Sequence, residues 1–232
     1  MLWYRGWLET RARVFVALLW MILLLTGVHT LAARPPGPGV QRAETLAILA
    51  NTFMVVVFAI FAGAGIRTQA PFRAQKGLYG STLFTLSLPV SRFRLIAIRA
   101  GLGWLELAGL TAAYCLASWF LFPLNGLATP VEMIEHVATL IACFSSLYFF
   151  AVLLATILEE PWSIWGGMLA WIALWLISTY AHPPHLLDIY WAIGLGSPIV
   201  AHAIPRAPIA LSVALAAVLS FAALKIAERR EY

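Results

Sequence analysis

Imidazole and carboxylate side chains gather in one short stretch near the C-terminal third of the chain. His182-Pro-Pro-His185 is followed by Asp188, and these side chains are of the types that bind metal ions. The two prolines between the histidines, however, prevent the helical placement that would aim both imidazoles at one ion. We therefore expect a polar loop here and no metal site.

A serine and a histidine follow a little further on, in Gly196-Ser197 and His202. A nucleophilic serine needs a base held within hydrogen-bond reach by a rigid scaffold. These residues share one loop that offers no such scaffold, so we expect no catalytic residue here.

Glu159-Glu160 is the next pair with possible chemistry, because intramembrane proteases use the pattern E-E-x-x-x-R. The sixth position of that pattern is Ile164 in this chain, and no histidine follows in a suitable span. A solvated turn is the interpretation we adopt for the pair.

Glu106 is the candidate that remains, since it lies inside a long apolar stretch. An ionisable side chain within a membrane span is costly unless it faces protein or water, which favours a functional role. The alternative is a hydrogen bond between helices that fixes their packing, and the sequence leaves both open.

No G-x-x-x-x-G-K-[ST] pattern occurs, so the chain has no P-loop to hold ATP. We expect no catalytic, metal-binding or cofactor-binding residue of its own, and any ATP and Mg²⁺ would belong to another polypeptide.

The composition indicates an integral membrane protein. The chain has 232 residues, of which 62% are hydrophobic, and its mean hydropathy is +0.88; soluble domains are roughly 45–50% apolar. The basic residues flank apolar stretches, so we interpret them as topology signals and expect no nucleic-acid binding. Cys115 and Cys143 fall inside apolar stretches, where we expect them to act as small apolar side chains.

Six stretches are long enough to cross the bilayer, which takes about 20 apolar residues. A single all-α transmembrane domain, residues 1–232, is therefore predicted. The first apolar run is too long for a cleavable signal peptide and lacks a small-residue cleavage site after it, so we expect none. The expected spans are approximately residues 14–33, 46–66, 95–122, 133–158, 162–180 and 209–227.

Lys and Arg residues set the expected orientation, because they accumulate in cytoplasmic loops. With both termini cytoplasmic, 12 of the 15 Lys and Arg residues lie inside and 3 outside. The three outside are Arg34, Arg42 and Arg206.

Residues 186–204 are apolar enough to suggest a seventh span. Spanning there would move Lys225, Arg229 and Arg230 outside, and Gly194 and Pro198 would interrupt the helix. We therefore predict a re-entrant or interfacial segment on the outer side, broken near Gly194 to Pro198.

The cytoplasmic loop of residues 67–94 holds the most informative pattern. At helical spacing its apolar and its basic or small residues fall on different faces, which is typical of an amphipathic helix. Such a helix lies on the membrane surface or docks on a partner. Pro89 ends it, and Ser91 can cap the next helix. The two faces comprise Phe72, Tyr79, Leu83 and Leu86, and Arg73, Lys76, Gly77 and Gly80.

This loop resembles that of the ABC-2 type permeases, the membrane subunits of ATP-binding-cassette exporters. Their loop after the second span reads E-x-E-x-G-[ST], then a P-V-S-R nine residues after that Gly, then a Lys seven residues further. Here Gly80-Ser81 takes the first position, Pro89-Val90-Ser91-Arg92 the second, and Arg99 replaces the Lys. The chain departs from the pattern where the two glutamates fall on Lys76 and Leu78, so docking would need another charge arrangement.

The resemblance implies a multi-pass exporter subunit in a prokaryotic cytoplasmic membrane. It implies two copies of a separate ATPase, a second permease chain in a homodimer or heterodimer, and contact with membrane lipid. It also implies an unidentified lipid, drug or peptide as substrate. The residues expected to couple to the ATPase are Phe72, Arg73, Lys76, Tyr79, Gly80, Ser81, Leu83 and Leu86, and the hinge to the third span comprises Pro89, Val90, Ser91, Arg92, Arg94 and Arg99.

Two other functions stay open. A membrane-embedded enzyme would use Glu106, Glu159, Glu160 and the histidines. A membrane anchor for an ATPase, without transport, would share the docking helix.

Overall fold

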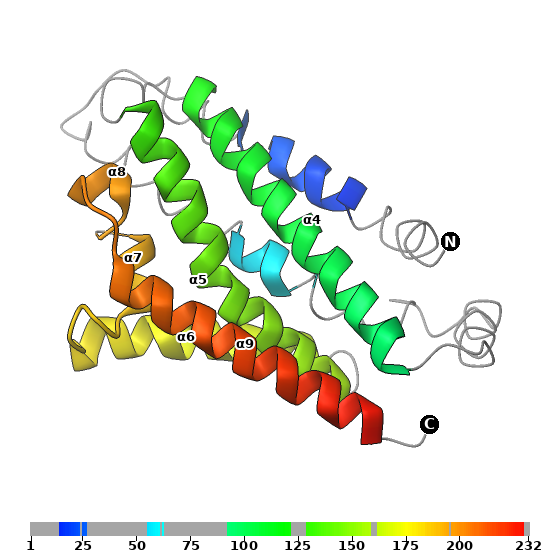
Figure 1. Cartoon of the computed structure of the whole chain (residues 1–232). Helices are drawn as coiled ribbons and strands as arrows, with labels where there is room; N and C mark the ends of the chain where they lie inside the picture. Colours follow the sequence, from blue (N-terminus) through cyan, green and yellow to red (C-terminus); the bar gives the residue numbers. More distant parts are fainter. Residues whose placement is uncertain are drawn as a thin grey trace.

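All regular structure in the described part of the chain is helical (Figure 1). The computed structural model describes residues 14–23, 25–26, 55–60, 62, 92–121, 129–158, 162–194 and 196–229. The longer helices are α4 (Arg92–Leu121), α5 (Pro130–Ile157), α6 (Trp162–Leu176) and α9 (Arg206–Arg229). The π-helical turn η2 (Ile177–Ala181) extends α6, and the short helices α7 (Ile189–Ile193) and α8 (Pro198–Ala201) precede α9.

Four helices are long and apolar enough to cross a membrane, which identifies a membrane protein. They are Ile96–Phe120, Pro130–Ile157, Trp162–Ala181 and Arg206–Ile226, and they coincide with the third to sixth spans expected from hydropathy. The first two expected spans are described only at residues 14–23, 25–26, 55–60 and 62, which are helical. A count of six spans therefore stays a prediction.

Helix α5 lies at the centre of the described structure. It contacts α4, α6, α7, α8 and α9, and Figure 1 shows α4 running beside it on one side and α9 crossing it on the other. In its most apolar stretch 61% of the residues are buried, against 6% in the stretch formed by α6 and η2. A helix that is apolar around its whole circumference suits such a central position, whereas α6 presents most of its surface outward, as a lipid-facing span does.

The start of α5 is fixed by its own sequence. Thr129 is the N-cap and Pro130 the first helical residue, where a proline costs no hydrogen bond. The Thr129 hydroxyl accepts from the Glu132 N–H, and the Glu132 carboxylate accepts from the Thr129 N–H at 2.6 Å. This reciprocal capping box satisfies two N–H groups that a helix start leaves without partners.

The helical structure of residues 186–204 is interrupted, as the sequence predicts. Helix α7 ends before Gly194 and α8 begins at Pro198, so residues 186–204 hold two short helices and no continuous span. At Gly196 a Cβ atom would overlap the Trp191 ring, so the turn between α7 and α8 requires glycine at this close approach. The predicted position of this segment on the outer side stays a prediction.

Candidate functional site

Helix α4 starts within the motif on which the family resemblance rests. Its first residue is Arg92, the last residue of the Pro-Val-Ser-Arg element, and its first turns carry Arg94, which is exposed, and Arg99, which is half-buried. The hinge residues Pro89, Val90 and Ser91 lie outside the described residues, as do the expected coupling residues Phe72, Arg73, Lys76, Tyr79, Gly80, Ser81, Leu83 and Leu86.

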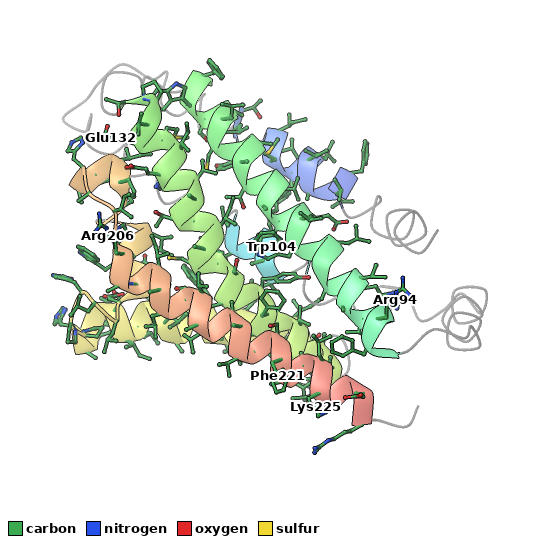
Figure 2. The ribbon with its side chains drawn as sticks, viewed as in Figure 1. Arg94, Trp104, Glu132, Arg206, Phe221 and Lys225 are labelled. Atoms are coloured by element: carbon green, nitrogen blue, oxygen red, sulfur yellow. The ribbon has the colours of Figure 1, made fainter. Side chains whose placement is uncertain are left out.

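The charged residues that are expected on opposite membrane sides lie at opposite ends of the molecule. Figure 2 shows Arg94 and Lys225 toward one end, and Glu132 and Arg206 toward the other. The first end also holds the last turn of α9, where Lys225 forms an ion pair with Glu228 at 3.2 Å. Arg206 therefore lies toward the opposite end from Arg94 and Lys225, and which of the two ends faces the cytoplasm stays a prediction.

Two hydrogen bonds join the first half of α4 to α5. The Tyr148 hydroxyl donates to the Ala100 carbonyl oxygen at 2.6 Å, and the Trp104 indole N–H donates to the Ser145 hydroxyl at 2.8 Å. Ser145 in turn donates to the Ile141 carbonyl oxygen on its own helix. Polar contacts between apolar helices fix their relative rotation and depth, so a displacement at the start of α4 would be passed to α5.

Gly103 permits the close approach at this contact. A Cβ atom there would lie 2.5 Å from the Tyr148 hydroxyl oxygen and 3.1 Å from the Ala62 carbonyl oxygen. Both distances are shorter than ordinary van der Waals contact, so a Cβ at position 103 would force the Tyr148 side chain or the neighbouring backbone to shift. Small residues at helix contacts let apolar helices approach closely within a membrane.

Glu106 lies near the middle of α4 and is partly buried. Its Oε1 atom is inaccessible to solvent. The position agrees with the expectation of an ionisable side chain inside a span, and both alternatives for its role stay open.

Asp188 and Ser178 hold the start of the broken segment against η2, the turn that extends α6. The buried Asp188 carboxylate accepts from the Ser178 hydroxyl at 2.6 Å, and it caps α7 by accepting from the Trp191 N–H at 2.9 Å. Burial, and then the negative charge of Asp188, raise the pKa of Tyr190, so this phenol keeps its proton. The Trp171 ring of α6 packs between Phe144 and Tyr190 with centroid distances of 5.5 Å and 5.6 Å.

Glu132 and His202 hold the other end of the same segment. The His202 Nδ1 atom lies 2.8 Å from the Glu132 Oε1 atom, which joins the end of α8 to the first turn of α5. The second carboxylate oxygen of Glu132 takes part in the capping box with Thr129. The Thr-x-x-Glu spacing is visible in the sequence as a helix-start signal, but nothing in it indicates a histidine 70 residues away.

The His185, Asp188 and His202 side chains take part in separate contacts. Within the described residues no group of three or more His, Cys, Asp or Glu side chains is placed to hold a metal ion. His185 stacks on the Trp191 ring at 4.4 Å, while the Asp188 carboxylate is used in the α7 cap. The Ser197 hydroxyl is buried, whereas the His202 side chain is 60% exposed and turned to Glu132.

Glu159 and Glu160 fall outside the described residues. Cys115 and Cys143 are both buried and form no disulfide, in keeping with the expectation of small apolar side chains.

No family model, curated protein or solved structure matches this chain. The resemblance to ABC-2 type permeases therefore depends on the loop residues and on the spans expected from the sequence.

Proposed function

We propose that the chain is the membrane-spanning permease subunit of an ATP-binding-cassette exporter in a prokaryotic cytoplasmic membrane. A separate ATPase subunit, present in two copies, hydrolyses ATP, and a second permease chain completes the transport path. The substrate is a lipid, an amphipathic drug or a peptide. The chain itself supplies no nucleotide site.

The observation that carries this proposal is the position of the Pro-Val-Ser-Arg element. It comes directly before a long apolar helix, since α4 begins at Arg92. The Gly80-Ser81 pair and Arg99 keep their spacing to this element in the sequence. Arg92, the last residue of the element, is the first residue of α4, and Arg94 two residues later lies toward the same end of the molecule as Lys225 (Figure 2).

The contacts of α4 give the coupling a physical route. ATP-driven closure of the two ATPase subunits pushes the amphipathic helix of approximately residues 72–86, and this push enters the membrane domain at the start of α4. The Tyr148–Ala100 and Trp104–Ser145 hydrogen bonds transfer the movement to α5. Because α5 contacts α4, α6, α7, α8 and α9, one displacement can rock the whole group.

Co-purification tests the proposal. The full-length tagged chain, expressed in its native host and extracted in mild detergent, should bring with it a P-loop protein and a matching ATP hydrolysis activity. Replacing Gln75 to Leu86 by a Gly/Ser linker of equal length should abolish both. The control replaces residues 35–39 of the expected outer loop in the same way and should leave both unchanged.

Three outcomes discriminate between the candidate functions. ATPase binding that survives the replacement of Gln75 to Leu86 contradicts the docking role. An embedded enzyme would be active without any ATPase and would lose activity in Glu106→Gln with complex assembly intact. An anchor would bind the ATPase but would show no stimulation of ATP hydrolysis by any transported substrate.

A further inference from the structure

The broken segment α7–α8 is fastened at both ends by one carboxylate each, and the two fastenings differ in kind. Asp188 at the start of the segment is 7% exposed and bonds to the neutral Ser178 hydroxyl. Glu132 at the end of the segment is on α5 and bonds to an imidazole, His202, that is 60% exposed. Only the second fastening joins an acid to a base that solvent can reach.

The residue that contacts Glu132, His202, has an uncommon backbone conformation. Its φ angle is 50°, in the left-handed region that residues with a Cβ rarely adopt. The residue ends α8 and turns the chain back toward α9, which begins at Arg206. A residue held in a sparsely populated conformation needs surrounding contacts to keep it there, so weakening the contact with Glu132 favours release of α8.

We propose that Glu132 and His202 form a pH-sensitive latch that holds the end of α8 against the first turn of α5. When the imidazole is protonated, the contact is an ion pair with a charge-assisted hydrogen bond, which is stronger than a neutral one. When the imidazole loses its proton, only a single hydrogen bond to the carboxylate is left. Since imidazole charge changes between pH 5 and 8, the latch tightens in that range as the pH falls and loosens as it rises.

Other charged or titratable side chains come from α5, which packs on α8, and from α7 and α9, which flank α8 in the chain. They include Glu135 and His136 on α5, Tyr190 on α7 and Arg206 at the start of α9. His136 is the other imidazole on these elements, so a His136→Gln variant is the control for the assignment to His202.

The exposure of two residues that flank α8 reports on the latch. Ser197, the N-cap of α8, is 1% exposed in the latched structure. Loosening of α8 would bring this position to solvent, whereas Ala203, one residue past His202, is exposed already. The two positions therefore form a matched pair of reporters, one sensitive to the latch and one insensitive.

Thiol labelling tests the latch in the full-length chain in membranes. Ser197→Cys and Ala203→Cys are placed separately in a background with Cys115→Ala and Cys143→Ala, and each reacts with a membrane-impermeant maleimide at pH 5.5 and pH 7.5. The ratio of the Ser197→Cys rate to the Ala203→Cys rate removes the effect of pH on thiol reactivity. An exposed ion pair contributes little to stability. We therefore expect the ratio of the two labelling rates to rise about twofold to fivefold from pH 5.5 to pH 7.5.

Two variants remove the contact between Glu132 and His202 while keeping the local fold. Glu132→Gln keeps a side chain that can complete the capping box but removes the negative charge, and His202→Asn removes the imidazole in favour of a residue that tolerates the left-handed conformation. Both should give the high ratio at pH 5.5 and abolish the pH dependence, while His136→Gln should retain it. A ratio that is independent of pH in the parent background, or a pH dependence that survives in His202→Asn, overturns the proposal.

The same labelling tests the latch and the expected orientation of the chain independently. The labelling is performed from outside on intact cells and repeated on inverted vesicles. If Ala203→Cys reacts only in inverted vesicles, the expected orientation is wrong, and the same ratio measured there still decides the latch.

Discussion

The hydroxyl of Tyr148 in the middle of α5 donates a hydrogen bond to the Ala100 carbonyl oxygen in the third turn of α4, with an oxygen–oxygen distance of 2.6 Å. Tyr148 is fully buried, and its ring also packs edge-to-face on Phe149. This bond joins the helix that follows the Pro-Val-Ser-Arg element to the central helix of the protein.

Removing the Tyr148 hydroxyl should weaken the α4–α5 contact. Tyr148→Phe keeps the ring and deletes the bond, so we expect a loss of about 1 kcal/mol in the free energy of unfolding, a usual value for one hydrogen bond within a membrane protein. Unfolding with sodium dodecyl sulfate in mixed micelles measures it. Tyr180→Phe is the control because Tyr180 is 74% exposed, and an equal loss in both variants would show that the buried bond contributes nothing.

Gly103 and Gly109 of α4 make a second matched pair. Gly103→Ala places a methyl group 2.5 Å from the Tyr148 hydroxyl oxygen, whereas nothing lies within 4 Å of a Cβ at Gly109. Gly103→Ala should destabilise the protein by about 1–3 kcal/mol, as overpacking does, and Gly109→Ala should be neutral or stabilising by up to about 1 kcal/mol. The same unfolding assay compares them, and equal effects would contradict the packing described for α4 and α5.

Combining two of these substitutions tests whether they act at one contact. Since Tyr148→Phe removes the atom that Gly103→Ala would strike, the double variant should lose less stability than the sum of the single variants, by at least about 0.5 kcal/mol. Strict additivity would place the two effects at independent sites.

Asp188 should determine the local stability of α7. Asp188→Ala removes the acceptor for the Trp191 N–H and the Ser178 hydroxyl, and loss of an N-cap costs about 1 kcal/mol. Asp188→Asn retains an N-cap oxygen and should cost less. Hydrogen exchange at the amide of Trp191 measures the difference. Faster exchange in Asp188→Asn than in Asp188→Ala would contradict the capping role.

The sequence predicts best the elements that depend on the residue pattern of a single segment. Hydropathy alone places the four long helices, because each needs about 20 apolar residues wherever it packs. Gly194 and Pro198 mark the break between α7 and α8, because glycine and proline act on the backbone directly.

The contacts that join the helices could not be predicted in the same way. Tyr148 and Ala100 are 48 residues apart and Glu132 and His202 are 70 residues apart, so their pairing depends on how the helices rotate and cross. The π-helical turn that positions Ser178 against Asp188 has no sequence signature of its own. The docking helix proposed for residues 72–86 lies outside the described residues and stays a prediction.

The side of the membrane on which Lys76 lies tests the central claim most directly, because a coupling loop can meet an ATPase only in the cytosol. Lys76→Cys, in the background without Cys115 and Cys143, is labelled with a membrane-impermeant maleimide on intact cells and on inverted vesicles, with Ala203→Cys as the opposite control. We predict labelling of Lys76→Cys in inverted vesicles alone. Labelling of Lys76→Cys on intact cells would contradict the proposal that this chain is the permease subunit of an ATP-driven exporter.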